Sequence, residues 1–205
     1  MKRLSAGLFL LVACGAVNAS VIWEPGNHPE TNEQNVVFNQ SGLDLGPALT
    51  VMGETQSGYL VSFTSNENLF APSLGQARVA AEDGAFTQLG IALGGDVFTG
   101  IIFNLNTENS TQGVVTIVVS ELAGPGATFV FPVAQGQNFL TITATNGEFL
   151  KSVSITSTVD VNDIRQTRIS GAGEAQAVVP EPDTYLLLAT GLGWIGLAGK
   201  FAKTL

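Results

Sequence analysis

The amino-acid sequence predicts an all-β fold, an antiparallel, jelly-roll-like β-sandwich of about ten strands. Apolar and polar residues alternate in short segments, most clearly over residues 138–145, where Leu140, Ile142 and Ala144 would face the core. Glycine and asparagine residues that favour turns separate most of these segments. Short alternating segments divided by turns are typical of two packed antiparallel sheets.

Eleven segments carry this strand pattern. They are residues 35–39, 48–52, 59–65, 76–80, 86–93, 98–104, 114–121, 128–133, 138–145, 153–159 and 164–170. The run from Val114 to Val119 scarcely alternates, so we expect a central strand that is covered on both faces. We expect irregular chain over residues 20–34, the β domain over 35–170 and a flexible linker over 171–178.

The dipeptide Asn146-Gly147 predicts a two-residue type I′ hairpin between the segments on either side of it. In that register Thr141 would lie opposite Ser152. Other pairs of the same register set polar against apolar residues, so we also expect a bulge or a longer loop near residues 148–151.

The β domain is strongly acidic. Four basic and fifteen acidic residues lie between residues 20 and 179, which leaves a net charge of −11. Such a surface repels the phosphates of a nucleic acid, and no basic run with interleaved aromatic residues is present. We therefore expect no nucleic-acid partner, and partners that are neutral or cationic.

Residues 1–19 have the three parts of a signal peptide. Lys2 and Arg3 form a positive start, an apolar stretch follows, and small residues precede a cleavage site between Ala19 and Ser20. The only cysteine, Cys14, ends the run Leu-Val-Ala-Cys, which resembles the lipobox of bacterial lipoproteins. Cleavage after Ala19 is the preferred interpretation and lipidation of Cys14 is the alternative; under the first, the mature chain contains no cysteine and no disulfide.

The C-terminal residues 179–205 also form three parts. Val179-Pro180-Glu181-Pro182 comes first, an uncharged, largely apolar run over residues 184–199 follows, and Lys200 and Lys203 stand near the end. Prolines block helix propagation and leave an extended stretch, whereas the apolar run partitions into lipid and the lysines stay cytoplasmic. Sixteen residues are short for a hydrocarbon core of about 30 Å. We expect a marginal transmembrane helix over residues 184–199.

This arrangement resembles the PEP-CTERM sorting signal, with Val179, Pro180, Glu181 and Pro182 as the matching motif. The same kind of tail is also labelled an ice-binding protein C-terminal domain, a label that says nothing about ice. The resemblance covers residues 179–205 only. It implies a Gram-negative bacterium, transient retention at the inner membrane, processing by an exosortase-type enzyme, and release to the cell surface or the extracellular polysaccharide matrix.

Few residues suit catalysis. His28, the only histidine, lies in a stretch rich in proline and turn formers, where a solvated loop histidine is expected. No second histidine completes a zinc site, and no Gly-x-Ser-x-Gly sequence is present. We therefore expect no enzymatic activity, no catalytic residues and no cofactor.

Calcium is the one metal for which ligand types are present in suitable turns. Carboxylate and amide oxygens, which hard cations favour, occur in residues 66–68, 82–84 and 160–163. None of these stretches is an EF-hand loop, and Asn, Asp and Gly are ordinary turn formers. We expect no committed metal ligand and keep calcium open.

A row of hydroxyl side chains is the remaining candidate for binding. Thr141, Thr143 and Thr145 would lie beside Ser152, Ser154 and Thr156 on a flat face that a polysaccharide could contact. We expect an exported protein with a structural or adhesive role at the cell surface or in the extracellular matrix. A carbohydrate-binding module is the alternative, and a secreted hydrolase is a third interpretation.

Deleting residues 180–205 should release the protein into the periplasm or the medium. The intact chain should be held at the inner membrane for a time and then cut near Pro180–Pro182, because a short, glycine-rich span is a weak permanent anchor. Pulse-chase labelling with a terminal tag would show loss of the tail only in cells that possess exosortase. A full-length chain that stays in the membrane would indicate a plain C-terminal anchor.

Overall fold

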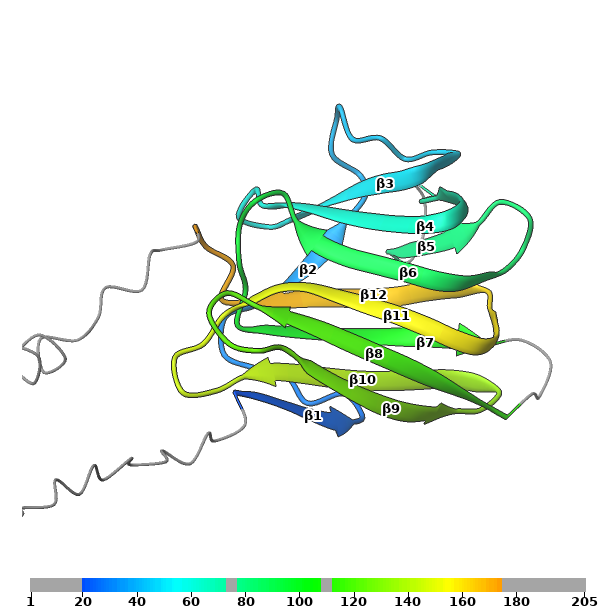
Figure 1. Cartoon of the computed structure of the whole chain (residues 1–205). Coiled ribbons are helices and arrows are strands. Elements are labelled where there is room, and N and C mark those ends of the chain that lie inside the picture. The colour runs from blue at the N-terminus through cyan, green and yellow to red at the C-terminus, as the bar shows by residue number, and fades with distance from the viewer. Residues whose placement is uncertain (1–19, 73–76, 108–111, 175–205) are drawn as a thin grey trace, which may run out of the picture. The chain divides into compact units, whose positions relative to one another are not determined.

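The computed structural model describes residues 20–72, 77–107 and 112–174. These residues form twelve β-strands and contain no helix, so the all-β class is confirmed (Figure 1). The strands are β1 Val21–Pro25, β2 Glu33–Val37, β3 Ala48–Thr55, β4 Leu60–Phe70, β5 Arg78–Ala81, β6 Phe86–Leu93, β7 Gly100–Thr107, β8 Gly113–Glu121, β9 Ala127–Val133, β10 Gly136–Ala144, β11 Leu150–Val161 and β12 Asp163–Ser170.

Each of the eleven predicted segments overlaps a strand, from β2 to β12. The irregular chain that the sequence predicts over residues 20–34 is not what the structure shows, because this segment contains β1 and the start of β2. Only Val21, Ile22 and Trp23 are apolar in β1, and turn formers follow directly. The strand pattern is therefore too short to be recognised, and pairing with β10 makes β1 a strand.

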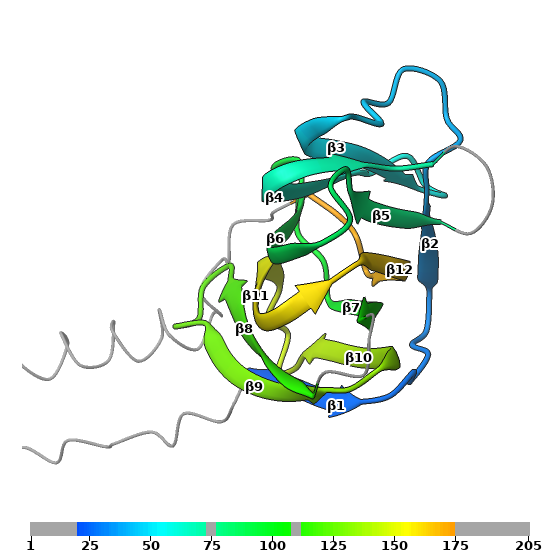
Figure 2. The same cartoon turned by 90° about the vertical axis from the view of Figure 1, so that its right-hand side faces the viewer.

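All strands belong to one antiparallel sheet that folds back on itself. The hydrogen-bonded order is β1-β10-β7-β12-β2-β3-β4-β6-β11-β8-β9, and β5 pairs with both β12 and β4. Strands β12, β2, β3, β4 and β5 consequently form a closed ring. Figure 2 shows β10, β7 and β12 facing β8, β11 and β6 across the core. The two separate sheets that a sandwich requires are not confirmed, because hydrogen bonds join the two sides.

A bend in β12 makes this closure possible. The first half of β12 pairs with β5 and the second half with β2, while the opposite edge pairs with β7 in both halves, with a shift of register between Arg165 and Arg168. Between the halves, Gln166 has a φ of 51° and its N–H donates to the Ala77 carbonyl over 3.1 Å. A residue in this conformation interrupts the ladder as a bulge does, so one strand edge serves two partners.

Ion pairs fix both halves of β12. The buried Asp163 accepts two hydrogen bonds from Arg165, at 2.5 and 2.6 Å, and also pairs with Arg78. The hydrogen bond to Asp163 raises the pKa of the Arg165 guanidinium, against the opposing effect of burial. In the second half, Arg168 donates to Glu33 of β2 at 2.5 Å. The charge-assisted Arg168–Glu33 bond joins β12 to β2, whereas Arg165 and Asp163 belong to the same strand and the 3.7 Å ion pair with Arg78 connects Asp163 to β5.

The core fills the space between the facing strands with alternating side chains, including the fully buried Phe63, Phe86, Phe98 and Phe103. On the side opposite the hydrogen-bonded ring, aromatic packing closes the fold. Trp23 of β1 stacks on Phe129 of β9 at a centroid distance of 5.5 Å and meets Phe131 edge-on at 6.3 Å. The two strands at the ends of the sheet, β1 and β9, are therefore joined by side chains.

The expectation that the run from Val114 to Val119 is covered on both faces is wrong. Val115, Ile117 and Val119 are buried, whereas Val114 and Val118 are 37% and 44% exposed. Strand β8 lies between β11 and β9, but one face of these strands is in contact with solvent. Valine suits a strand on either face, so composition concealed an ordinary alternation.

The Asn146-Gly147 turn is present, but the predicted hairpin is wrong. Both residues have positive φ, 57° and 75°, and the Glu148 N–H donates to the Thr145 carbonyl at 3.1 Å, as a type I′ turn requires. The chain after the turn crosses the core, however, so that β10 pairs with β1 and β7 while β11 pairs with β6 and β8. Thr141 and Ser152 are therefore not neighbours.

Replacing Trp23 with alanine should destabilise a chain of residues 20–178 by about 2–3 kcal/mol, less than the 3–5 kcal/mol of a fully buried aromatic side chain because Trp23 is half-buried. Urea titration followed by far-ultraviolet circular dichroism measures the change. Ile22→Ala, on the exposed side of the same strand, should change the stability by no more than about 0.5 kcal/mol. Equal effects of both variants would contradict the closing role of Trp23.

Candidate functional site

Most residues that the sequence marks for targeting lie outside the described part of the chain. These are Ala19 and the motif residues Val179, Pro180, Glu181 and Pro182, together with the predicted helix over 184–199. Ser20, on the other side of the predicted cleavage site, is the first described residue. No candidate membrane-spanning helix occurs among the residues that the structure describes.

The structure brings two of the three calcium-candidate stretches together. Asn66, Glu67 and Asn68 line an open pocket of about 410 Å³ with Glu82 and Asp83. Asn68 donates to the Glu82 carboxylate at 3.2 Å, so part of the ligand set is already engaged. Over residues 20–72, 77–107 and 112–174, no group of three metal-ligating side chains lies close enough to hold a metal ion.

His28 and the predicted threonine row meet at β10. His28 is exposed, its Nε2 lies 2.9 Å from the Pro25 carbonyl oxygen, and its backbone N–H donates to Thr141 at 3.1 Å. The Thr141 hydroxyl donates to the Gly26 carbonyl, and Thr143 donates to Glu30. The chain after β1 therefore covers this half of the predicted hydroxyl row.

The other half of that row belongs to a much wider surface. Six strands, β3-β4-β6-β11-β8-β9, turn one face to solvent, and none of the residues on that face is buried. We call the central part of this surface the hydroxyl face; outward-facing residues at the strand ends, such as Glu54 and Thr158, lie outside it. Its residues are Thr50, Met52, Ser62, Thr64, Gln88, Gly90, Ala92, Thr116, Val118, Ser120, Thr128, Val130, Ser152, Ser154 and Thr156.

The strand register aligns these residues in rows across the sheet. The central row crosses all six strands and consists of Thr50, Thr64, Gly90, Ser154, Val118 and Thr128. At a strand spacing of about 4.8 Å the row spans about 24 Å. Rows of Ser152 with Ser120 and of Thr156 with Thr116 run on either side of it.

The hydroxyl face is electrically neutral. Nine of its fifteen residues carry a hydroxyl group and none is ionisable, although the domain has a net charge of −11. Three of the four basic residues between positions 20 and 179, Arg78, Arg165 and Arg168, pair with carboxylates beside β12 instead. Glu54, which follows Thr50 and Met52 on the outward side of β3, is a carboxylate at the margin of this surface, so the absence of charge applies to its central residues.

Most side chains of the hydroxyl face are short, so they project little from the sheet. Position 90 has room for a side chain, because a Cβ there would meet nothing closer than the Thr64 carbonyl oxygen at 3.7 Å. Some of these hydroxyl groups already form hydrogen bonds within the protein. The hydroxyl oxygens of Thr50 and Thr64 lie 2.9 Å apart, and the Ser62 hydroxyl donates to the Ala92 carbonyl at 3.1 Å. Ser154, Thr156 and Ser120 are exposed on neighbouring strands.

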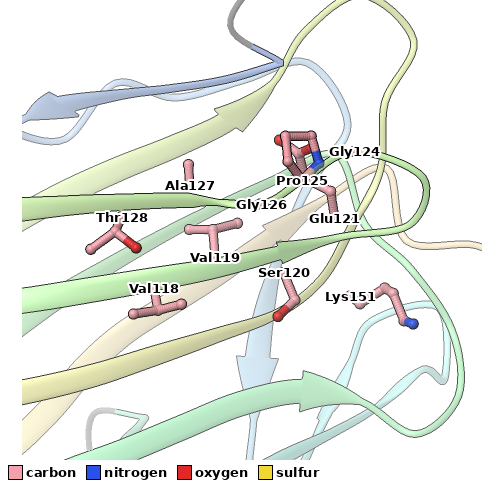
Figure 3. Close-up of a pocket in the computed structure, with 10 residues that line it drawn as sticks. All are labelled: Val118, Val119, Ser120, Glu121, Gly124, Pro125, Gly126, Ala127, Thr128 and Lys151. Carbon is pink, nitrogen blue, oxygen red and sulfur yellow. The ribbon is translucent and has the colours of Figure 1, made fainter.

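One corner of the hydroxyl face opens into a shallow pocket of about 400 Å³ (Figure 3). Val118, Ser120 and Thr128 of the face line it together with Lys151 and the connection between β8 and β9. Within the described residues, Lys151 is the one basic residue without an ion pair to a carboxylate. The corner therefore combines a cation with neutral hydroxyls, and the carboxylate of Glu121 at the end of β8 also lines it.

This arrangement suits a neutral ligand with many hydroxyl groups. Each serine and threonine hydroxyl can donate one hydrogen bond and accept others, and Val118 and Val130 add apolar contact. An exposed aromatic platform is not part of the face, because Trp23 packs inward against Phe129 and Phe131. No family model, curated protein or solved structure matches this chain.

The sequence indicated only a small part of the hydroxyl face. Ser152, Ser154 and Thr156 were recognised because they alternate along one strand. The same alternation of hydroxyl and core residues occurs at Ser62 and Thr64, but these positions are about 90 residues away in the chain, and pairing alone makes them part of the same surface.

Gly90→Ala should raise the free energy of unfolding by about 0.5–1 kcal/mol, because the position has space and glycine is costly within a strand. Gly53→Ala is the matched control in β3. A Cβ there would lie 2.6 Å from Val36, so we expect a loss of about 1–3 kcal/mol. Thermal or urea unfolding of both variants would test this, and a loss of stability in Gly90→Ala would show that packing requires the glycine.

Proposed function

We propose that this protein is exported and has an adhesive or structural role at the cell surface or in the extracellular polysaccharide matrix, and that the hydroxyl face contacts neutral polysaccharide. The neutrality of this face on an otherwise acidic domain is the observation that carries the proposal. In this proposal the supporting architecture is a jelly-roll-like sandwich whose two layers are joined on one side by the ring around β12.

The chemistry of the face supports a polysaccharide as the ligand. Unlike a nucleic acid, a neutral sugar polymer experiences little repulsion from the acidic surroundings. Its hydroxyl groups can exchange hydrogen bonds with Ser154, Thr156, Ser120 and Thr128, which lie on three adjacent strands. A row of about 24 Å can contact several sugar units at once, and many weak contacts along one polymer sum to useful attachment.

The terminal segments support the location. Residues 1–19 resemble a signal peptide, and residues 179–205 resemble a PEP-CTERM tail, which implies an exosortase-type partner and transient membrane retention. Bacteria that use such tails make extracellular polysaccharide. The ligand and the place of action are therefore consistent with each other.

The alternative functions differ in what they need. A carbohydrate-binding module would recognise one polysaccharide class, and the aromatic side chains that often serve such recognition are here turned inward at Trp23. A hydrolase would need two carboxylates facing each other across a cleft at a separation of about 5–9.5 Å. The hydroxyl face has no carboxylate, so adhesion is the function that its residues favour.

Ser154→Arg should reduce binding to neutral polysaccharide about tenfold, which corresponds to 1.4 kcal/mol, because a long charged side chain would stand in the central row. Binding is measured on an array of neutral and anionic glycans. Gln137→Arg, an exposed position of β10, makes the same change in charge outside the hydroxyl face and should leave binding unchanged.

Three results would argue against the proposal. Saturable binding to a single polysaccharide class would favour the carbohydrate-binding module. Equal loss in both arginine variants would indicate a general charge effect. Self-association in sedimentation experiments without glycan binding would leave a structural role and exclude the polysaccharide contact.

A further inference from the structure

Glu121, at the end of β8, is a buried carboxylate with an incomplete set of partners. The residue is 7% exposed, and its Oε2 atom has no hydrogen-bond partner among the described residues. Oε1 accepts a hydrogen bond from the hydroxyl of Ser20 at 2.5 Å. Lys151 lines the same corner pocket but makes no ion pair with this carboxylate. An unpaired buried carboxylate is costly, so a cationic partner is expected.

The connection between β8 and β9 leaves space for this carboxylate. In the connection between β8 and β9, Gly124 packs directly against Glu121, and Figure 3 shows the two residues side by side. A Cβ at position 124 would lie 1.5 Å from Oε2, so any side chain there would displace the carboxylate. Leu122 and Ala123 complete the turn, with the Leu122 N–H donating to the Phe149 carbonyl at 2.8 Å.

Hydrogen bonds of both its backbone and its hydroxyl hold Ser20 next to the Glu121 carboxylate. Its carbonyl accepts a hydrogen bond from the Thr145 N–H at 2.7 Å, and Val21 then pairs with Ala144 at the start of β1. The backbone nitrogen of a serine is only three bonds from its hydroxyl oxygen. The nitrogen of Ser20 therefore lies close to the Glu121 carboxylate.

We propose that Glu121 is the binding site for the α-ammonium group of the mature chain, which signal-peptide removal creates at Ser20. The inference relies on the predicted cleavage between Ala19 and Ser20 and does not depend on the polysaccharide function. Water adds across that peptide bond: Ala19 gains a carboxylate, and Ser20 gains an amino group that is protonated at neutral pH. Before cleavage the same nitrogen is an uncharged amide.

The new ion pair has a structural consequence. It connects the start of β1 to the end of β8, two strands that lie on opposite sides of the core and share no hydrogen bonds with each other. Trp23 already closes this side by packing on Phe129 and Phe131. The ammonium adds a charge-assisted bond on the same side of the fold as these aromatic contacts. Export and processing therefore complete the closure of the domain.

The test compares four chains that end at Leu205 and are kept in a mild detergent. Two begin at Ser20 and two carry two additional glycines before it; each pair has either native Glu121 or Glu121→Gln. With Glu121, the chain that begins at Ser20 should melt about 2–4 °C higher than the extended chain. With Glu121→Gln, the difference should disappear. Equal melting temperatures in the Glu121 pair would overturn the proposal.

A second measurement does not depend on any variant. In the native chain that begins at Ser20, acylation of the α-amino group should be several-fold slower when the protein is folded than when it is unfolded in urea. Mass spectrometry of the N-terminal peptide separates this amine from the lysines. Equal rates would overturn the proposal, as would an exported protein whose first residue is not Ser20. Neither outcome bears on glycan binding by the hydroxyl face.

Discussion

The bend of β12 at Gln166 is the feature on which the rest of the architecture depends. A strand has two edges, and β12 must pair with β7 on one edge while joining two further strands, β5 and β2, on the other. The positive φ of Gln166 divides that edge between them. Because β5 also pairs with β4, and β2 also pairs with β3, this division closes the ring and fixes which strands face each other across the core.

The same junction explains how charge is distributed over the domain. Arg165 and Arg168 pair with Asp163 and Glu33 on the two sides of the bend, where partial burial strengthens each ion pair. The domain has only four basic residues, and three of them, Arg78, Arg165 and Arg168, form ion pairs at this junction. The six-strand hydroxyl face contains no charge of either sign. Strands β3 and β4 belong both to the ring and to this face, and the proposed attachment to polysaccharide depends on the hydroxyl groups that the six strands present.

The location of the strands could be predicted, but their partners could not. Alternation along the chain revealed eleven of the twelve strands, since a strand in contact with both core and solvent must alternate. The turn at Asn146-Gly147 formed with the expected dihedral angles, yet β10 and β11 separated to opposite sides of the core. A turn fixes only its own four residues. Pairing is decided by the contacts of whole strands, and Leu150 pairs with Glu121 and Phe98 rather than with β10.

The sequence by itself determined the all-β class, the acidic charge and the two terminal segments that suggest export, because each is a property of composition or of neighbouring residues. The tertiary structure alone decided the extent of the hydroxyl face, the inward position of Trp23, and the meeting of Ser20 with Glu121, which are 101 residues apart. Such features depend on strand order and register. Those depend on long-range burial and pairing, to which every strand of the core contributes and which no local pattern encodes.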